Sequence, residues 1–189
     1  MANRPTNRRI VTSTGSDFYP TPAWATRALM ESETFLGEIW EPACGTGDMS
    51  RVIEDYGFKV KSTDLNDYGY GEPNINFLHT EDEAMNIITN PPYNLAQDFI
   101  EKSLLITKRK SAFLMRLAFL EGVNRQQTLF TKMPPARVWV FSERITFYPA
   151  GVKKAGSGTT AYAWFVWDKE YSGETVLKWL KPGFKSRDG

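Results

Sequence analysis

The chain has 189 residues, of which 41% are hydrophobic and 24% charged, and its formal net charge is +1. This is the composition of an ordinary globular domain, and no apolar run approaches the roughly 18 residues of a membrane-spanning helix. The single cysteine, Cys44, and the single histidine, His79, exclude an internal disulfide and a zinc site of cysteines and histidines. Because the amino terminus also lacks the apolar segment of a secretory signal, we expect a cytoplasmic protein without a structural metal.

Predicted helices and strands alternate along the chain. Residues 1–16 are expected to form a flexible, basic tail, and 17–189 a single domain without a separate large target-recognition domain. The first helix begins near Pro22, with Thr21 as a candidate N-cap. Three further helices are expected at 48–56, 94–107 and 123–132. Seven strands are expected at 38–41, 59–64, 75–78, 86–89, 111–120, 136–150 and 161–171.

This order of elements predicts an α/β fold. Strands that alternate with helices form parallel sheets with helices on both faces. The apolar run within 111–120 fits a strand that is buried on both faces. Because no helical pattern separates the final two strands, we expect a mostly parallel seven-stranded sheet whose last strand is antiparallel.

Acidic residues and glycines follow the first two strands. Residues 41–47 read Glu-Pro-Ala-Cys-Gly-Thr-Gly, called the glycine loop below, and Asp64 ends the next strand. Glycines allow a tight turn and a close approach of backbone to ligand, and an acid after the second strand can bind ribose hydroxyls. The chain has no G-x-x-x-x-G-K-[ST] segment, which excludes a P-loop. This pattern indicates a nucleoside ligand that carries an ammonium group rather than phosphates.

The fourth strand runs directly into the sequence Asn90-Pro91-Pro92-Tyr93, called the proline loop below. Two adjacent prolines cannot continue a helix and donate no backbone N–H to a sheet. They can, however, stiffen a loop and hold the Pro91 carbonyl and the Asn90 side chain in a fixed direction.

With these motifs the sequence resembles the S-adenosylmethionine-dependent methyltransferases that methylate amino groups in DNA. The resemblance covers about residues 17–168 and is strongest to the short adenine N6-methyltransferases of bacteriophages and prophages, through DFYPTP (17–22), the glycine loop, the proline loop and the late RITFYP segment. It implies a Rossmann-like methyltransferase fold and S-adenosylmethionine as cofactor. The cofactor-binding residues that it implies are Phe18, Tyr19, Thr21, Glu41, Pro42, Cys44, Gly45, Gly47, Asp64, Leu65, Phe77 and Asn90. The family often has an acid before the aromatic residue at Phe77, whereas this chain has Asn76.

The resemblance also assigns the reaction to the proline loop, with Asn90, Pro91, Pro92 and Tyr93 as catalytic residues. The exocyclic amine of adenine is a poor nucleophile, and the Asn90 oxygen and the Pro91 carbonyl can accept its two hydrogens. Tyr93 can stack on a base flipped out of duplex DNA, with Phe147 on the other face and Tyr148 as the reserve. The arginines that are candidates for phosphate or guanine contacts are Arg116, Arg125, Arg137 and Arg144.

Several alternatives stay open at the level of the sequence. Residues 66–74, 119–136 and 149–160 are the expected target-reading loops. The proline loop also serves amine methylation of RNA and glutamine methylation of proteins, and a catalytically idle binder of cofactor or DNA is possible. Cys44 is interpreted as a small loop residue rather than a nucleophile. The sequence predicts neither the recognition site nor the oligomeric state.

Overall fold

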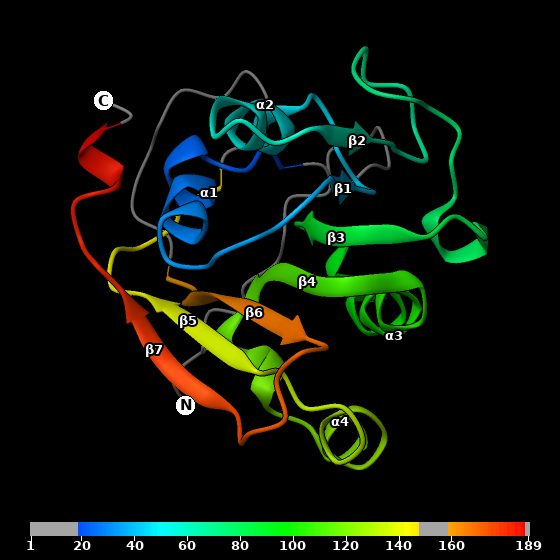
Figure 1. The fold of residues 1–189 in the computed structure, drawn as a ribbon. Helices are drawn as coiled ribbons and strands as arrows, with labels where there is room; N and C mark the ends of the chain where they lie inside the picture. Colours follow the sequence, from blue (N-terminus) through cyan, green and yellow to red (C-terminus); the bar gives the residue numbers. More distant parts are fainter. Residues whose placement is uncertain (1–18, 148–158, 188–189) are drawn as a thin grey trace, which may run out of the picture.

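The structure, a computed structural model, describes residues 19–147 and 159–187, so the expected tail at 1–16 lies outside the described residues. Within these ranges seven strands form a single sheet, in the order β2-β1-β3-β4-β6-β5-β7 (Figure 1). The strands are β1 (Ile39–Glu41), β2 (Val60–Ser62), β3 (Ala84–Thr89), β4 (Thr107–Arg116), β5 (Arg137–Phe141), β6 (Tyr162–Asp168) and β7 (Val176–Leu180).

The direction of the strands confirms the predicted fold class. The first four strands pair parallel to one another, and β7 pairs parallel to β5. Only β6, among the described strands, runs antiparallel, and it lies between β4 and β5. The fold is therefore an α/β fold with a mostly parallel seven-stranded sheet and one antiparallel strand near its end.

The expected strands at 111–120 and 136–150 lie instead at Thr107–Arg116 and Arg137–Phe141, and two further strands differ in kind from the prediction. The expected strand at 75–78 is instead a 3₁₀ turn, η1 (Phe77–His79), because the Asn76 side-chain oxygen accepts the N–H of Leu78 at 3.1 Å. The seventh strand is β7, which the prediction missed. Four of its five residues are exposed, so its sequence lacks the alternation of buried and exposed residues that marks most strands.

Helices cover both faces of the sheet (Figure 1). On one face, α1 (Ala23–Met30) and α2 (Asp48–Asp55) bury Leu29 and Ile53 in one hydrophobic cluster. On the other face, α3 (Ala96–Ile106) buries Phe99 in a second cluster. The remaining helical segments are α4 (Val123–Arg125), the π-helical turn η4 (Gln126–Phe130) and the 3₁₀ turns η2 (Tyr93–Leu95), η3 (Leu117–Leu120) and η5 (Lys185–Arg187). In the described part of the chain, no helix is both long and apolar enough to cross a membrane.

The expected N-cap of α1 is wrong. Pro22 occupies the capping position and no side chain caps the helix. The Thr21 hydroxyl instead accepts a hydrogen bond from the Asn90 amide nitrogen at 3.1 Å. A long-range contact therefore outweighs the local capping preference of threonine.

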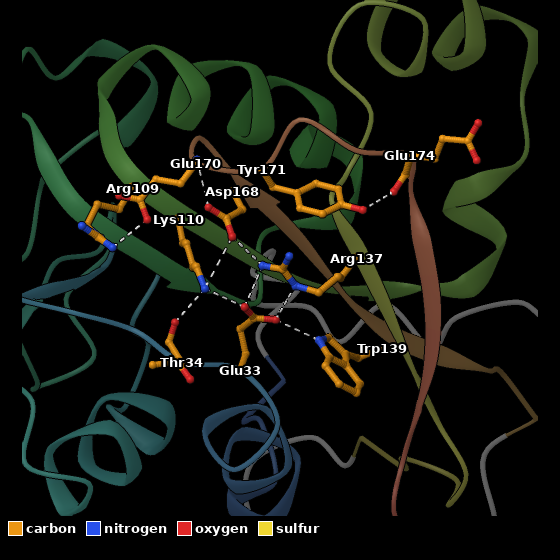
Figure 2. Close-up of polar contacts among 10 residues, drawn as sticks. All are labelled: Glu33, Thr34, Arg109, Lys110, Arg137, Trp139, Asp168, Glu170, Tyr171 and Glu174. Atoms are coloured by element: carbon orange, nitrogen blue, oxygen red, sulfur yellow. Dashed lines mark hydrogen bonds and ion pairs between the residues drawn. The ribbon is translucent and has the colours of Figure 1, made fainter.

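A buried ionic cluster joins the segment after α1 to the sheet (Figure 2). The Glu33 carboxylate accepts two hydrogen bonds from Arg137 and one from Lys110, each at 2.7 Å. Arg137 also donates to Asp168 at 2.7 Å. Arg137 is thus engaged at the start of β5, and the expectation that it contacts phosphate or guanine is wrong. The cluster ties the segment after α1 to β4, β5 and β6, while the opposite end of α1 leads to Thr21.

Candidate active site

The carboxyl ends of β1, β2 and β3 border a cavity of about 320 Å³. Parallel strands bring their carboxyl ends to one edge, which is where open α/β sheets bind ligands. The volume lies in the range, roughly 300–1,000 Å³, that is usual for small-molecule and cofactor sites. The predicted site residues that line the cavity are Tyr19, Thr21, Glu41, Pro42, Cys44, Asp64, Leu65, Phe77, Asn90, Pro91, Pro92 and Tyr93.

The two glycines of the glycine loop support the cavity without lining it. The Gly45 N–H donates to the Asp64 carboxylate at 2.9 Å. Gly47 has a φ of 81°, and a Cβ there would lie 2.4 Å from the ring of Tyr70. Glycine is therefore required at 47 by the backbone conformation and by the packing of Tyr70.

The Asp64 carboxylate is buried and held by backbone groups. Its two oxygens accept the N–H groups of Gly45 and Asn66, each at 2.9 Å. Each carboxylate oxygen has a second lone pair. Asp64 can therefore accept two more hydrogen bonds from a ligand in the cavity without any change in its own position.

Glu41 brings a second carboxylate to the cavity and is only 2% exposed. Its side chain accepts a hydrogen bond from the Ser50 hydroxyl, and no cation within the described ranges pairs with it. Burial raises the pKa of Glu41 well above its usual value, and the nearby Asp48 and Asp64 raise it further. A cationic group in the cavity would compensate this carboxylate, so the two acids fit a ligand with one ammonium and adjacent hydroxyls.

Glu41→Gln is expected to stabilise the ligand-free protein at neutral pH. Because the pKa of Glu41 is raised in the folded protein, the unfolded chain loses the Glu41 proton at a lower pH than the folded protein does. The free energy of unfolding therefore falls as the pH rises from the pKa of Glu41 in the unfolded chain toward its pKa in the folded protein. The wild type should therefore lose up to about 1.4 kcal/mol per pH unit in this window relative to the variant. Urea unfolding between pH 4 and pH 8 measures the difference, and a gap that does not change with pH would contradict it.

Asn90 directly follows β3, and among the described residues its amide nitrogen has a hydrogen-bond partner whereas its amide oxygen has none. The nitrogen donates to Thr21, whereas the buried Oδ1 has no hydrogen-bond partner in the described part of the chain. A buried acceptor without a partner costs roughly 1–3 kcal/mol and marks a position where a ligand is expected. Pro91 and Pro92 follow Asn90 and line the same cavity.

Aromatic side chains border the proline loop on one side of the cavity. The ring of Tyr93 lies 6.3 Å from that of Tyr162, and Phe147 contacts Tyr162 edge-on at 5.0 Å. The Arg116 guanidinium lies over the Tyr93 ring at 5.1 Å from its centroid. The structure thus brings the predicted residues Phe147 and Arg116 to the proline loop, although neither lines the cavity.

A scan against protein-family models and a search of curated proteins find no match to this sequence. Solved structures do match. One is the modification subunit of a candidate type I restriction enzyme from Vibrio vulnificus, with a TM-score of 0.60 and 15% identity over 90% of this chain and 49% of that one. Another is the methyltransferase subunit of a type I restriction-modification system from Streptococcus thermophilus, with a TM-score of 0.58 and 12% identity over 82% and 45% of the two chains.

A third match is a candidate RNA methyltransferase from Pyrococcus horikoshii, with a TM-score of 0.60 and 14% identity over 81% of this chain and 88% of that one. The chain has a methyltransferase fold. It spans about half the length of the two restriction-modification subunits, 49% and 45% respectively. At sequence identities of 12–15%, the similarity to these structures establishes the fold alone. The activity depends on the residues of the site.

The remaining predicted residues lie away from the cavity of this methyltransferase fold or outside the described ranges. Arg125 donates to the carbonyls of Phe119 and Glu121, so its guanidinium holds its own loop. Arg144 donates to the Thr159 carbonyl at 3.1 Å. Phe18, Tyr148 and most of the loop at 149–160 lie outside the described residues.

Several residues that border the site were not predicted as cofactor-binding residues, although two of them, Asn66 and Tyr68, lie in the expected target-reading loop at 66–74. Asn66 and Tyr68 line the cavity after β2, and their position just beyond a strand end is the signal that could have indicated them. Tyr162 is the first residue of β6. Because β6 is antiparallel, its amino end lies at the edge where the parallel strands have their carboxyl ends. A search for residues at the carboxyl ends of strands therefore does not find Tyr162.

Cys44 and the acidic residues do not indicate covalent or metal chemistry. Burial, together with the Glu41 charge, raises the pKa of the Cys44 thiol to about 12, so the thiol stays protonated. Over 19–147 and 159–187, no group of three or more histidine, cysteine, aspartate or glutamate side chains is placed to hold a metal ion.

Proposed function

We propose that this protein transfers a methyl group from S-adenosylmethionine to the exocyclic N6 amine of adenine in DNA. One observation carries the proposal: the buried amide oxygen of Asn90 has no hydrogen-bond partner among residues 19–147 and 159–187, and Asn90 lines the same cavity as Glu41 and Asp64. A planar amine that reaches this oxygen would satisfy it. In sequence the protein resembles the short phage and prophage enzymes of this kind.

The cavity fits the proposed cofactor at both of its polar ends. The Glu41 carboxylate would bind the ammonium of the methionine part, and Asp64 the two ribose hydroxyls. Phe77, which is 2% exposed and lines the cavity, would offer its ring to the adenine of the cofactor. When bound, the cofactor supplies an electrophilic methyl group on a sulfonium.

The proline loop would hold the target amine for a direct displacement. The N6 lone pair of adenine is delocalised into the ring, so the amine needs orientation more than a strong base. Asn90 and the Pro91 carbonyl would each accept one N6 hydrogen and direct the lone pair at the methyl group. Held there by Asn90 and Pro91, the amine would form the new N–C bond as the S–C bond of the bound cofactor breaks, with S-adenosylhomocysteine as the leaving group, and the product amine would then lose its extra proton to water.

DNA is supported as the substrate by the likeness to the two subunits of type I restriction-modification systems. A target base in duplex DNA must be flipped out, at a cost of a few kcal/mol. Stacking on Tyr93, beside Tyr162 and Phe147, would return roughly 1–3 kcal/mol. Arg116, which is exposed and lies over Tyr93, is the proposed phosphate contact nearest to the flipped base.

Methylation of an amine in RNA is the second candidate, supported by the likeness to the candidate RNA methyltransferase from Pyrococcus horikoshii. Both reactions place a planar amine on Asn90. The test is transfer of labelled methyl from S-adenosylmethionine to unmethylated DNA, to RNA and to bulk protein in parallel. We expect label in DNA. Label only in RNA would make RNA methylation the favoured function in place of DNA methylation. No label in any acceptor would overturn both proposals.

A further inference from the structure

We propose that Thr21 is a positioning residue that fixes the orientation of the Asn90 amide. This inference rests on the proposed function, since it concerns how Asn90 presents its oxygen to the target amine. The two residues are 69 positions apart in sequence, and the Asn90 Nδ2 group donates to the Thr21 hydroxyl at 3.1 Å.

The orientation of this amide decides whether the site can bind an amine. An asparagine side chain has a donor end, the NH₂ group, and an acceptor end, the carbonyl oxygen, which are almost equal in shape. If the Asn90 amide rotated by 180°, its NH₂ group would face the NH₂ group of the target base. Two hydrogen-bond donors do not bond to each other. Because Thr21 bonds the nitrogen, the oxygen is the end that remains without a partner in the described part of the chain.

Thr21 itself is held on a rigid part of the fold. It is 7% exposed and directly precedes Pro22, whose carbonyl accepts the N–H of Ala25 at 2.9 Å in the first turn of α1. Trp24 and Ala25 of this helix are buried in the hydrophobic cluster of the sheet. A partner fixed in this way limits the positions that the Asn90 amide can adopt, which is what a preorganised site requires.

The Thr21 hydroxyl can also form a hydrogen bond with a ligand in the cavity. While the oxygen accepts from Asn90, no described residue accepts the hydroxyl hydrogen, and Thr21 lines the cavity. An anionic group of a bound ligand that accepts this hydrogen would keep the hydroxyl oxygen turned to Asn90. Cofactor binding would then favour the amide orientation that binds the target amine.

The test compares Thr21→Val with Thr21→Ser and Thr26→Val. Valine has nearly the shape of threonine without the hydroxyl, and serine restores the hydroxyl. Thr26 is a matched control, since its buried hydroxyl in α1 has no partner within the described ranges. At saturating cofactor we expect kcat to fall about 10- to 100-fold in Thr21→Val and to stay within about threefold of wild type in the other two. A kcat for Thr21→Val within about twofold of wild type, or an equal loss in Thr21→Ser, would overturn the inference.

A second readout does not depend on activity. In ¹⁵N-labelled, cofactor-free protein, the Asn90 side-chain amide is identified by the signal that Asn90→Ala removes. Its NH₂ protons should exchange with water more slowly in wild type and Thr21→Ser than in Thr21→Val. Equal exchange in all three would overturn the inference. If instead the exchange differs but no acceptor is methylated, the Thr21 contact stands and the proposed function fails.

Discussion

Asn90→Ala is expected to lower the rate of methyl transfer by at least about 10²–10³-fold while cofactor affinity stays within about threefold of wild type. The substitution removes the acceptor for the target amine and leaves Glu41 and Asp64 in place. Because these acids lie on β1 and beyond β2, they do not depend on the Asn90 side chain for their position. Single-turnover kinetics and calorimetric titration with S-adenosylmethionine measure the two quantities separately.

Asn94→Ala is the matched control for this experiment. Asn94 lies four residues downstream, is exposed and does not line the cavity. Its replacement should leave both quantities at the wild-type level. Parallel loss of turnover and of cofactor affinity in Asn90→Ala would show that Asn90 supports the cofactor rather than the amine, and would contradict its proposed role.

Glu33→Ala is expected to reduce the free energy of unfolding by about 3–5 kcal/mol. Glu33 has a side chain that is 5% exposed, and it pairs with Lys110 and Arg137. Its removal leaves two largely buried cations with Asp168 as the remaining carboxylate of the cluster (Figure 2). Urea unfolding at pH 7 measures the loss.

The control and the pH dependence follow from the same geometry. Glu31 pairs with Arg187 at the surface, where both side chains are exposed, so Glu31→Ala should cost less than about 1 kcal/mol. Burial raises the pKa of Glu33, but the hydrogen bonds from Arg137, Lys110 and Trp139 outweigh it and leave the pKa below its usual value. The stabilisation by the Glu33 carboxylate should therefore be fully present above the pKa that Glu33 has in the unfolded chain. It should disappear as the pH falls through the pKa that Glu33 has in the folded protein. Equal losses in Glu31→Ala and Glu33→Ala would contradict a special role for the cluster.

The sequence predicted which residues line the cavity because its two acidic residues and its asparagine lie at the ends of predicted strands. Glu41, Asp64 and Asn90 each end or follow a predicted parallel strand, and parallel strands place these ends together at one edge. The fold class followed from the alternation of strands and helices in the same way. Both inferences depend on local patterns, which a single sequence displays directly.

Long-range contacts explain what the sequence did not predict. Arg137 is bonded to Glu33, 104 residues away, so its charge is used inside the fold and not at a surface for DNA. Thr21 has the residue type of an N-cap but bonds to Asn90. The strand β7 is recognisable only by its pairing with β5, since most of its side chains are exposed. In each case a partner distant in sequence outweighs the local preference.

Nucleoside analysis of methylated DNA measures directly whether this protein methylates the N6 amine of adenine. Unmethylated DNA is incubated with S-adenosylmethionine and either the wild-type protein or Asn90→Ala, digested to nucleosides and analysed by mass spectrometry. We expect N6-methyladenine with the wild type and none above background with the variant. Methyl groups on another base or another atom of adenine, or equal methylation by both proteins, would contradict it.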